Sequence, residues 1–393
     1  MAKICLVTSS VFTHGGEQRV TVVIANELAK QHEVVIYTMD TEEERLANPY
    51  GLEERIEIRY TKQPEFGILN RVARRVIREV NERTKLLYDK KIFYSVLEYA
   101  YFQKKWQSMW VEELSKETYD IIIGVSGGNS MRLGLIADRL NCKTVGWEHN
   151  AYEAYFETPG LYFWHMDQVF GASARKLDHC IVLNHYIAKK YKEAFNVDCD
   201  VIYNPRSFAS DVKSKLENKT FVGCGRFITQ KGFDLLVQSF AQFARWDSEW
   251  KLVLVGDGEM RTELESSIRE SNLEERIHIT GYTNEVRKYL QEASVYVLSS
   301  RWEGFPMVLT EAFEMGLPVV AYDITAVEPL VEDGKQGLLA KAFDTKEFAQ
   351  KMLEITKMSD EELREMACNA IEKAESLAIE NIIAQWKKLL DAE

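Results

Sequence analysis

The sequence predicts an α/β protein built on two doubly wound sheets of parallel strands. Short runs rich in β-branched residues alternate with helix-length segments along the whole 393-residue chain. Strands that alternate with helices in this way pair in parallel, through right-handed crossovers. Several of the runs are apolar at nearly every position, as strands covered on both faces are. A chain of this length is expected to hold two or three domains.

The predicted strands fall into two series separated by a polar stretch. The first series comprises residues 3–8, 34–38, 56–60, 120–124, 143–147, 181–183 and 201–203. The second comprises residues 221–224, 251–255, 277–280, 295–298 and 318–322. Asn204-Pro205 opens the polar stretch, which ends at Lys219. We therefore expect one domain over residues 1–205 and another over 206–375, followed by an amphipathic helix over 376–390.

Charge and cysteine usage exclude several classes of protein. The net charge of −12 and the pI near 5.3 argue against a nucleic-acid partner. The six cysteines are scattered, without the spacing of a zinc site or a disulfide framework, which favours reduced thiols in the cytoplasm. No secretion signal is expected from the first residues, and no run reaches the roughly 18 apolar residues of a membrane span. Any membrane contact should therefore be peripheral.

The most informative motif runs from Arg301 to Glu311, as Arg-Trp-Glu-Gly-Phe-Pro-Met-Val-Leu-Thr-Glu. It follows an apolar strand and leads into a helix whose first turn is expected to contain Pro306. Glu303 should lie in the loop and Glu311 inside the helix. Carboxylates accept hydrogen bonds from sugar hydroxyls, and the amides of a helix start bind anionic oxygens. The amides expected to face such a ligand belong to Gly304, Phe305 and Met307.

A second motif, Gly225-Arg226-Phe227-Ile228-Thr229-Gln230-Lys231-Gly232, also follows a predicted strand. Arg226 comes just after the strand and Lys231 at the entrance of the next helix. A planar guanidinium and an ammonium at that spacing can converge on a diphosphate. A solvated pair of cations is the plain alternative, but ligands of α/β sheets bind at the carboxyl ends of the strands. This placement favours a diphosphate site.

Three weaker signals follow strands of the first series. Gly15 and Gly16 open a helix and allow close approach of a ligand, although the third glycine of a dinucleotide fingerprint is missing, which argues against NAD. His149 ends a strand within Trp-Glu-His-Asn and can hydrogen-bond a sugar hydroxyl or act on the acceptor. The run Ser-Gly-Gly-Asn over residues 126–129 either shapes the acceptor side or simply starts a helix. The histidines show no metal-ligand spacing, and Asp257, between two glycines, reads best as a structural turn.

One segment carries charge of the opposite sign. Residues 59–105 contain 12 basic and 5 acidic residues, a local charge of +7. Within this segment, four arginines recur at helical spacing, opposite Leu69, Val72, Val76 and Val80, and they are Arg71, Arg74, Arg75 and Arg78. Such a helix attracts anionic headgroups or a phosphate-bearing acceptor. The alternative is an ordinary surface helix whose apolar stripe packs on the core.

Taken in order, these motifs resemble the retaining GT-B glycosyltransferases of family 4, which include many builders of bacterial surface polysaccharides. The resemblance covers nearly the whole chain and rests on five motifs: Gly-Gly-Glu-x-Arg, Glu-His-Asn, Gly-Arg-x4-Lys-Gly, Gly-Asp-Gly-Glu and Glu-Gly-Phe-Pro-x4-Glu. It implies a GT-B fold, in which two Rossmann-like domains face a cleft. It also implies that the C-terminal helix (residues 376–393) crosses back onto the first domain.

The resemblance assigns roles to the motif residues. Arg226 and Lys231 would bind the donor diphosphate, Glu311 the nucleotide ribose, and Glu303 the hydroxyls of the transferred sugar. The backbone around Gly281 and Tyr282 would receive the base. The loops containing Gly15, Gly16, Gly304, Phe305, Pro306 and Met307 complete the expected donor site.

We therefore expect a retaining hexosyltransferase that uses a nucleotide sugar, with UDP favoured over GDP, and a lipid-linked or polysaccharide acceptor. The two cations should replace a metal, and no cofactor is expected. The enzyme should be cytoplasmic and peripherally bound to the inner face of the plasma membrane. Two alternatives remain: an epimerase on the same scaffold, and a non-catalytic protein that binds nucleotide sugars. A phosphorylase is disfavoured because no lysine motif for pyridoxal phosphate is present.

Overall fold

In the computed structural model, which describes residues 1–61, 66–84, 86–88 and 91–390, the chain forms two compact units. Unit 1 comprises Met1–Tyr203 with Ile382–Glu393, and unit 2 comprises Asn204–Asn381. The boundary between the two units follows Tyr203, two residues before the expected boundary after residue 205. The chain returns to unit 1 at residue 382, whereas the return was expected at 376. Residues 391–393 of the predicted C-terminal segment lie outside the described part.

Unit 1 contains a seven-stranded sheet in the order β3-β2-β1-β4-β5-β6-β7. All its strands are parallel. The strands are β1 (Lys3–Val7), β2 (Glu33–Thr38), β3 (Glu57–Tyr60), β4 (Ile121–Val125), β5 (Lys143–Trp147), β6 (His179–Val182) and β7 (Asp200–Val201). The helices are α1 (Gly16–Leu28), α2 (Glu42–Arg45), α3 (Ile68–Arg83), α4 (Tyr94–Tyr101), α5 (Lys104–Leu114), α6 (Ser126–Gly134), α7 (Asp167–Ala174), α8 (His185–Phe195) and α15 (Ile379–Leu390).

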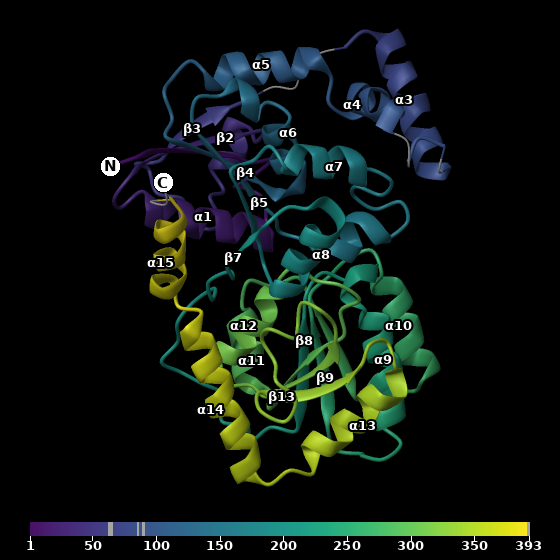
Figure 1. The fold of residues 1–393 in the computed structure, drawn as a ribbon. Helices are drawn as coiled ribbons and strands as arrows, with labels where there is room; N and C mark the ends of the chain where they lie inside the picture. Colours follow the sequence, from purple (N-terminus) through teal and green to yellow (C-terminus); the bar gives the residue numbers. More distant parts are fainter. Residues whose placement is uncertain (62–65, 85, 89–90, 391–393) are drawn as a thin grey trace. The chain divides into compact units, whose positions relative to one another are not determined.

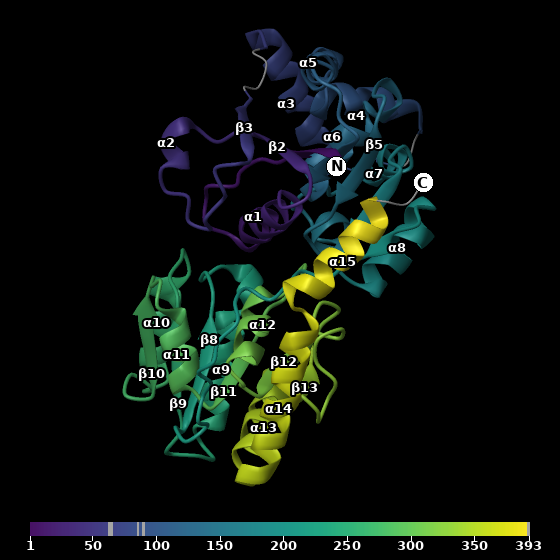
Figure 2. The same cartoon turned by 90° about the vertical axis from the view of Figure 1, so that its left-hand side faces the viewer.

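Helices cover both faces of this sheet, which is why its strands are apolar on both sides. Figures 1 and 2 show α1 and α15 on one side and α5, α6 and α7 on the other. Cys5 and Val7 of β1 pack with Trp110 and Leu114 of α5. On the opposite face, Trp386 of α15 lies edge-on against Trp147 of β5, with ring centroids 4.7 Å apart. This contact anchors the C-terminal helix to unit 1.

Unit 2 contains a six-stranded parallel sheet in the order β10-β9-β8-β11-β12-β13. The strands are β8 (Thr220–Cys224), β9 (Lys251–Val255), β10 (Ile277–Gly281), β11 (Val295–Leu298), β12 (Val319–Asp323) and β13 (Gly337–Lys341). The helices are α9 (Phe233–Phe243), α10 (Arg261–Glu270), α11 (Val286–Glu292), α12 (Met307–Glu314), α13 (Thr345–Thr356) and α14 (Asp360–Ser376). The fold class predicted from the sequence is confirmed: both units are doubly wound α/β sheets.

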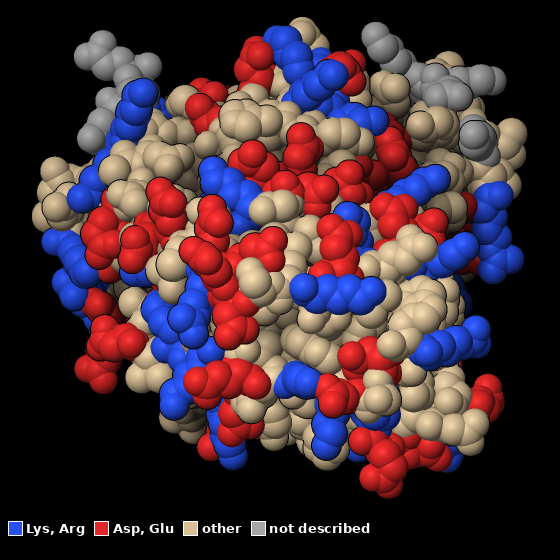
Figure 3. Space-filling model, turned by 90° about the horizontal axis from the view of Figure 1, so that it is seen from below, with Lys and Arg blue, Asp and Glu red and all other residues tan. Residues whose placement is uncertain are grey.

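The core of unit 2 lies between its sheet and the helices α9, α10 and α13. Phe233, Phe240 and Phe243 of α9 pack with Phe348 and Met352 of α13 against the strands. Edge strand β13 was not among the predicted strands, and the predicted C-terminal helix begins at Ile379 rather than at residue 376. Within the described residues, no helix is long and apolar enough to cross a bilayer. On the face drawn in Figure 3, basic and acidic side chains are interspersed, and neither sign dominates.

Candidate active site

The strongest candidate site lies at the carboxyl end of the unit 2 sheet, where the strand order reverses. Strands β8 and β11 are neighbours at the centre of the sheet, and the chain leaves them in opposite directions, toward β9 and toward β12. In doubly wound sheets, ligands bind at such a switch point, outside the carboxyl ends of the strands. The loop after β8 spans residues 225–232, and the loop after β11 spans residues 299–306. Both predicted motifs therefore meet at one place.

At the centre of this place Lys231 and Glu303 form an ion pair. The Nζ atom of Lys231 lies 2.6 Å from Oε1 of Glu303, and the side chains are 21% and 5% exposed. The Ser300 hydroxyl donates a hydrogen bond to the same oxygen, also at 2.6 Å. The structure thus brings together the cation of one motif and the first carboxylate of the other, 72 residues apart in sequence.

The two loops are held to each other by backbone contacts. The N–H of Arg301 donates to the carbonyl of Gln230 at 2.7 Å, and the Gln230 amide nitrogen donates to the carbonyl of Trp302 at 3.1 Å. Gly232 has a φ of 63°, and a Cβ there would lie 2.1 Å from the carbonyl oxygen of Ser299. Only glycine allows this approach. The loop over residues 225–232 (the lysine loop) can therefore pack closely against the loop over residues 299–306 (the glutamate loop).

Arg301 adds a second connection between these elements. Its guanidinium forms a bidentate pair with Asp234 of α9, at 2.8 and 2.6 Å. Burial alone would raise the pKa of Asp234, but the hydrogen bond and charge of Arg301, together with backbone hydrogen bonds, lower it. Arg301 therefore fixes the helix that follows the lysine loop, and it is a structural residue of the motif.

Arg226 is exposed at the start of the lysine loop. The backbone beside it is fixed, because the N–H of Phe227 donates to the carbonyl of Asp257 at 2.8 Å. The Asp257 side chain accepts from the Gly258 N–H and from Arg261, each at 2.8 Å, and these two bonds lower its pKa. Asp257 thus forms the structural turn that the sequence indicated. Among the described residues, no three histidines, cysteines or acidic residues are grouped in a way that could hold a metal ion.

The glutamate loop leads directly into α12. Gly304, Phe305 and Pro306 are buried, and the helix begins at Met307, with Pro306 as its N-cap rather than in its first turn as expected. The first turn of any helix leaves backbone N–H groups without intrahelical partners. Glu311 is buried within α12, and burial together with the Glu311 charge raises the pKa of Cys224 at the end of β8. Glu311 therefore lies at the same switch point.

The segment expected to receive a base follows β10. Gly281 has a φ of 78°, in the region that favours glycine, and forms a bridge with Gly256. The next residue, Tyr282, is 65% exposed, and its hydroxyl donates to Asn284 at 3.0 Å. An exposed ring beside a fixed turn offers a flat surface on which a base can stack.

Unit 1 has its own switch point between β1 and β4, and it is also polar. Gly15 precedes α1, where its N–H donates to the Tyr50 hydroxyl at 2.8 Å, and Gly16 begins the helix. Ser126 begins α6 with a φ of 71°, a left-handed conformation that is uncommon for serine. Burial raises the pKa of Glu17, against the opposing effect of the nearby Ser126 hydroxyl. Strained backbone of this kind is concentrated at functional sites.

The end of β5 adds two buried ionisable side chains to unit 1. Burial lowers the pKa of His149 to about 3, so its ring is neutral near pH 7, and Nε2 has no hydrogen-bond partner among the described residues. Burial raises the pKa of Glu148 to about 8, against the opposing effect of the Ser130 and Tyr155 hydroxyls. Neither Glu148 oxygen has a hydrogen-bond partner of good geometry in the described residues. A neutral imidazole with a free nitrogen suits a hydroxyl ligand.

Sequence reasoning assigned no role to several of these residues. Ser300 lies two residues after the buried strand β11, and that position was the signal that could have identified it. Glu148 also follows a buried strand, next to the histidine that the sequence did single out. Ser126 belongs to the run over residues 126–129, which was expected either to shape the acceptor side or to start a helix, but its left-handed backbone has no local sequence signal.

The four arginines predicted to meet a membrane or acceptor divide into two pairs. Arg71 and Arg75 are exposed on α3. Arg74 and Arg78 are partly buried, and both donate to the carbonyl oxygen of Ala100 at 2.9 to 3.0 Å.

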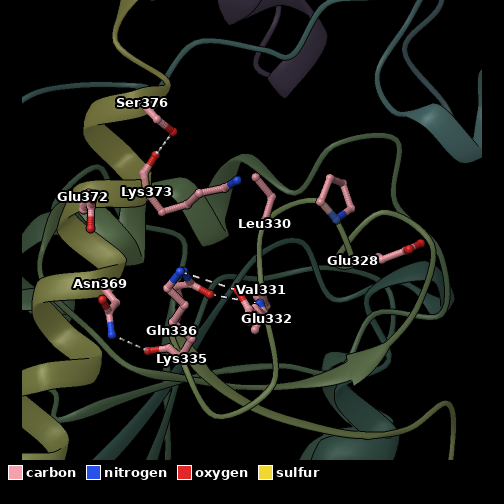
Figure 4. Close-up of a pocket in the computed structure, with 11 residues that line it drawn as sticks. Glu328, Leu330, Val331, Glu332, Lys335, Gln336, Asn369, Glu372, Lys373 and Ser376 are labelled. Carbon is pink, nitrogen blue, oxygen red and sulfur yellow. Dashed lines mark hydrogen bonds and ion pairs between the residues drawn. The ribbon is translucent and has the colours of Figure 1, made fainter.

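A separate pocket of about 390 Å³ lies in unit 2 between the segment 328–336 and α14. Figure 4 shows Lys373 extending from α14 across this space toward Leu330. None of the site residues predicted from the sequence lines it. It is therefore distinct from the candidate active site.

Two family models match the chain. The model described as "Glycosyl transferases group 1" matches residues 206–374, and the model described as "Glycosyltransferase Family 4" matches residues 14–207. The first holds the Lys231–Glu303 pair, and the second holds Gly15, Ser126 and His149 of unit 1. The chain belongs to the family 4 glycosyltransferases. This GT-B glycosyltransferase is an enzyme of the class that the sequence predicted.

Related sequences support the same assignment. An uncharacterized glycosyltransferase of Haemophilus influenzae is 28% identical over 398 residues, covering 99% of this chain and 100% of its own. The poly(ribitol-phosphate) α-N-acetylglucosaminyltransferase of Staphylococcus aureus is 25% identical over 288 residues, covering 72% of this chain and 58% of its own. A Campylobacter jejuni N-acetylgalactosaminyltransferase named for a diphospho-undecaprenol substrate is 29% identical over 172 residues, covering 42% of this chain and 46% of its own.

Solved structures share the fold. The chain is similar to a variant of S. aureus TarM in complex with UDP, fondaparinux and α-GlcNAc-glycerol, with a TM-score of 0.76, 17% identity and full coverage of both chains. It is also similar to Anabaena HepE in complex with UDP and glucose, with a TM-score of 0.72, 17% identity and full coverage of both chains.

Proposed function

We propose that this glycosyltransferase transfers a hexose from a UDP-sugar to a lipid-linked or polysaccharide acceptor during surface glycan biosynthesis, with retention of anomeric configuration. The observation that carries the proposal is the Lys231–Glu303 pair, 2.6 Å apart at the switch point of unit 2. A cation for the diphosphate and an acceptor of sugar hydroxyl bonds are thus held side by side. We propose that the bond between the sugar and the diphosphate of the donor lies beside this pair.

The proposed binding of the nucleotide sugar rests on residues near the Lys231–Glu303 pair. Arg226 is exposed on the same loop as Lys231, and two cations match the charge of a nucleoside diphosphate. Glu311 is assigned to the ribose, and the exposed ring of Tyr282 to the base. UDP is preferred over GDP because UDP is the nucleotide in the complexes of TarM and HepE, which share the fold.

In the proposed mechanism, Arg226 and Lys231 neutralise the charge that develops on the leaving diphosphate. Preorganised groups of this kind each stabilise a transition state by roughly 3 kcal/mol. The cations then take the place of a metal ion, so chelators should leave transfer intact. Glu303 binds the sugar, and the neutral ring of His149 hydrogen-bonds a sugar hydroxyl. The acceptor attacks from the face of the leaving group, whose phosphate takes the proton.

The proposed acceptor is inferred from the names of related enzymes. One acts on poly(ribitol-phosphate), and another is named for a diphospho-undecaprenol saccharide. The polar switch point of unit 1, with Glu17 and Ser126, offers hydrogen bonds to an acceptor hydroxyl. A lipid-linked acceptor requires the enzyme to work at a membrane, and the basic segment over residues 59–105 supports peripheral association with its inner face.

A panel of nucleotide sugars tests the proposal. Thermal shift identifies the donor, and transfer to lipid-linked saccharides is then followed by mass spectrometry, with NMR to assign the anomer formed. We expect one UDP-hexose to stabilise the protein and to be transferred with retention, with EDTA having no effect. Release of an isomerised free sugar without any acceptor would identify an epimerase. Tight UDP binding without transfer or hydrolysis of any donor would identify a binding protein.

A further inference from the structure

The helix α3 is packed on unit 1 by its polar face. Its residues between Ile68 and Arg83 are strongly amphipathic, but Asn81 is the only one that is fully buried. The Asn81 amide donates to the carbonyl of His165 at 3.1 Å, and the His165 ring contacts the carbonyl of Asn81 at 2.7 Å. Asn70 hydrogen-bonds the Tyr99 hydroxyl at 3.1 Å. Polar contacts therefore take the place that apolar packing has in ordinary surface helices.

Two arginines of α3 belong to this inward face. Arg74 and Arg78 both donate to the carbonyl of Ala100, in the last turn of α4. Figure 1 shows α3 and α4 beside one another. Cations at a helix C-terminus satisfy its free carbonyls and interact favourably with its dipole. These arginines thus hold α3 in place, and their bonds to Ala100 leave fewer of their N–H groups for an outside ligand.

The apolar stripe of α3 faces outward as a consequence. Ile68, Leu69, Val72 and Val76 are 71%, 87%, 55% and 57% exposed. Leu86 and Ile92, beyond the end of the helix, are 67% and 77% exposed. Of the 14 large hydrophobic side chains exposed in the described part of the chain, 6 fall in this short stretch. The alternative considered from the sequence, a stripe packed on the core, is wrong.

We propose that the outward face of α3 is a membrane-docking surface that inserts Leu69, Val72 and Val76 into the headgroup region of an anionic bilayer. Two exposed arginines, Arg71 and Arg75, border the stripe, as in interfacial helices. The charge of +7 over residues 59–105, in a chain of net charge −12, complements anionic lipid rather than the chain itself. A second copy on this stripe would bring two basic helices together, which charge repulsion opposes.

This inference deepens the proposed function, because it names the surface that would bring the enzyme to a lipid-linked acceptor. It also changes the roles expected for the four arginines of α3. Apolar insertion and the outer arginines Arg71 and Arg75 act on the membrane, while Arg74 and Arg78 act on the protein.

Vesicle flotation of the full chain tests the proposal. Wild-type protein should float with phosphatidylcholine vesicles that contain phosphatidylglycerol, and less with phosphatidylcholine alone. The triple variant Leu69→Ser/Val72→Ser/Val76→Ser should bind at least about tenfold more weakly, since binding scales with the apolar area inserted. Arg71→Gln/Arg75→Gln should abolish the preference for anionic vesicles. The matched control Leu46→Ser/Val212→Ser, which alters exposed apolar side chains elsewhere, should bind as wild type does.

Two further measurements, tryptophan fluorescence and UDP binding, make the result interpretable. If the triple variant does not fold, Leu69→Trp replaces it, and its fluorescence should shift to the blue on vesicles and be quenched by brominated lipid. Equal flotation of the triple variant and its control, or an unshifted tryptophan, would overturn the proposal. The proposal would also be overturned if the wild type formed a dimer and the triple variant did not, because the stripe would then be a contact between two copies of the chain. The triple variant should bind UDP as wild type does. Failure of membrane docking can therefore be distinguished from failure of the proposed function.

Discussion

Glu148 leads to a quantitative prediction about stability and pH. The side chain is 1% exposed at the end of β5, and burial raises its pKa from 4.5 to about 8. An acid with a raised pKa in the folded state keeps its proton there after the unfolded chain has lost it. The stability of unit 1 is therefore highest below the unfolded pKa and falls as the pH rises toward 8.

The size of this loss follows from the shift. Each pKa unit corresponds to about 1.4 kcal/mol, so the full displacement is worth about 5 kcal/mol. Between about pH 5.5 and about pH 8, the part lost is about 3 kcal/mol. Replacing the carboxyl by an amide of the same shape removes the titration. Glu148→Gln should therefore gain about 3 kcal/mol relative to wild type over this interval. His149 titrates equally in both proteins, so its contribution cancels.

Urea unfolding read out by a deuterium pulse and mass spectrometry of β5 peptides measures this quantity for unit 1 alone. The matched control is Glu43→Gln, which makes the same change on the exposed surface of α2. Over the same pH interval, the gain in stability of Glu148→Gln should clearly exceed that of Glu43→Gln. The reasoning is refuted if Glu148→Gln follows the wild-type pH dependence, because the carboxyl would then be ionised in the folded protein.

Three other substitutions test separate parts of the structure. Arg226→Ala should lower turnover by about a hundredfold, as expected for loss of roughly 3 kcal/mol, with an unchanged circular dichroism spectrum. Glu303→Gln should abolish sugar transfer while UDP binding measured by calorimetry is retained; loss of UDP binding would refute its assigned role. Trp386→Ala removes the contact with Trp147 and should cost about 3–5 kcal/mol in unfolding free energy, whereas Trp246→Ala, at a half-exposed position, should cost far less.

The parts of the fold that the sequence predicted are those with strong local patterns. The buried strands before Arg226 and Glu303 were found because they are apolar and flanked by turn residues. Strand β13 was missed because Gly337 opens it and Lys341 ends it, which leaves only three apolar residues between them. Because parallel strands end at one edge, the meeting of Lys231 and Glu303 followed from their positions alone.

Two features could not have been found from local patterns. A helical wheel shows that α3 has an apolar and a polar side, but it does not show which side packs on the protein. That choice depends on the carbonyl of Ala100 and the backbone at His165, which are distant in sequence. Likewise, the burial of Glu148 depends on Tyr155 and on the close approach of Gly127, whose added Cβ would lie 2.9 Å from a Glu148 oxygen.

The central claim is that the lysine paired with Glu303 binds the diphosphate of the donor. Calorimetry of UDP with wild type, Lys231→Ala and the control Lys357→Ala, which removes an exposed lysine of unit 2, tests this most directly. Loss of a charge-assisted bond should weaken UDP binding roughly 10- to 100-fold in Lys231→Ala, while the control binds as wild type does. Equal affinity of all three proteins for UDP would contradict the account.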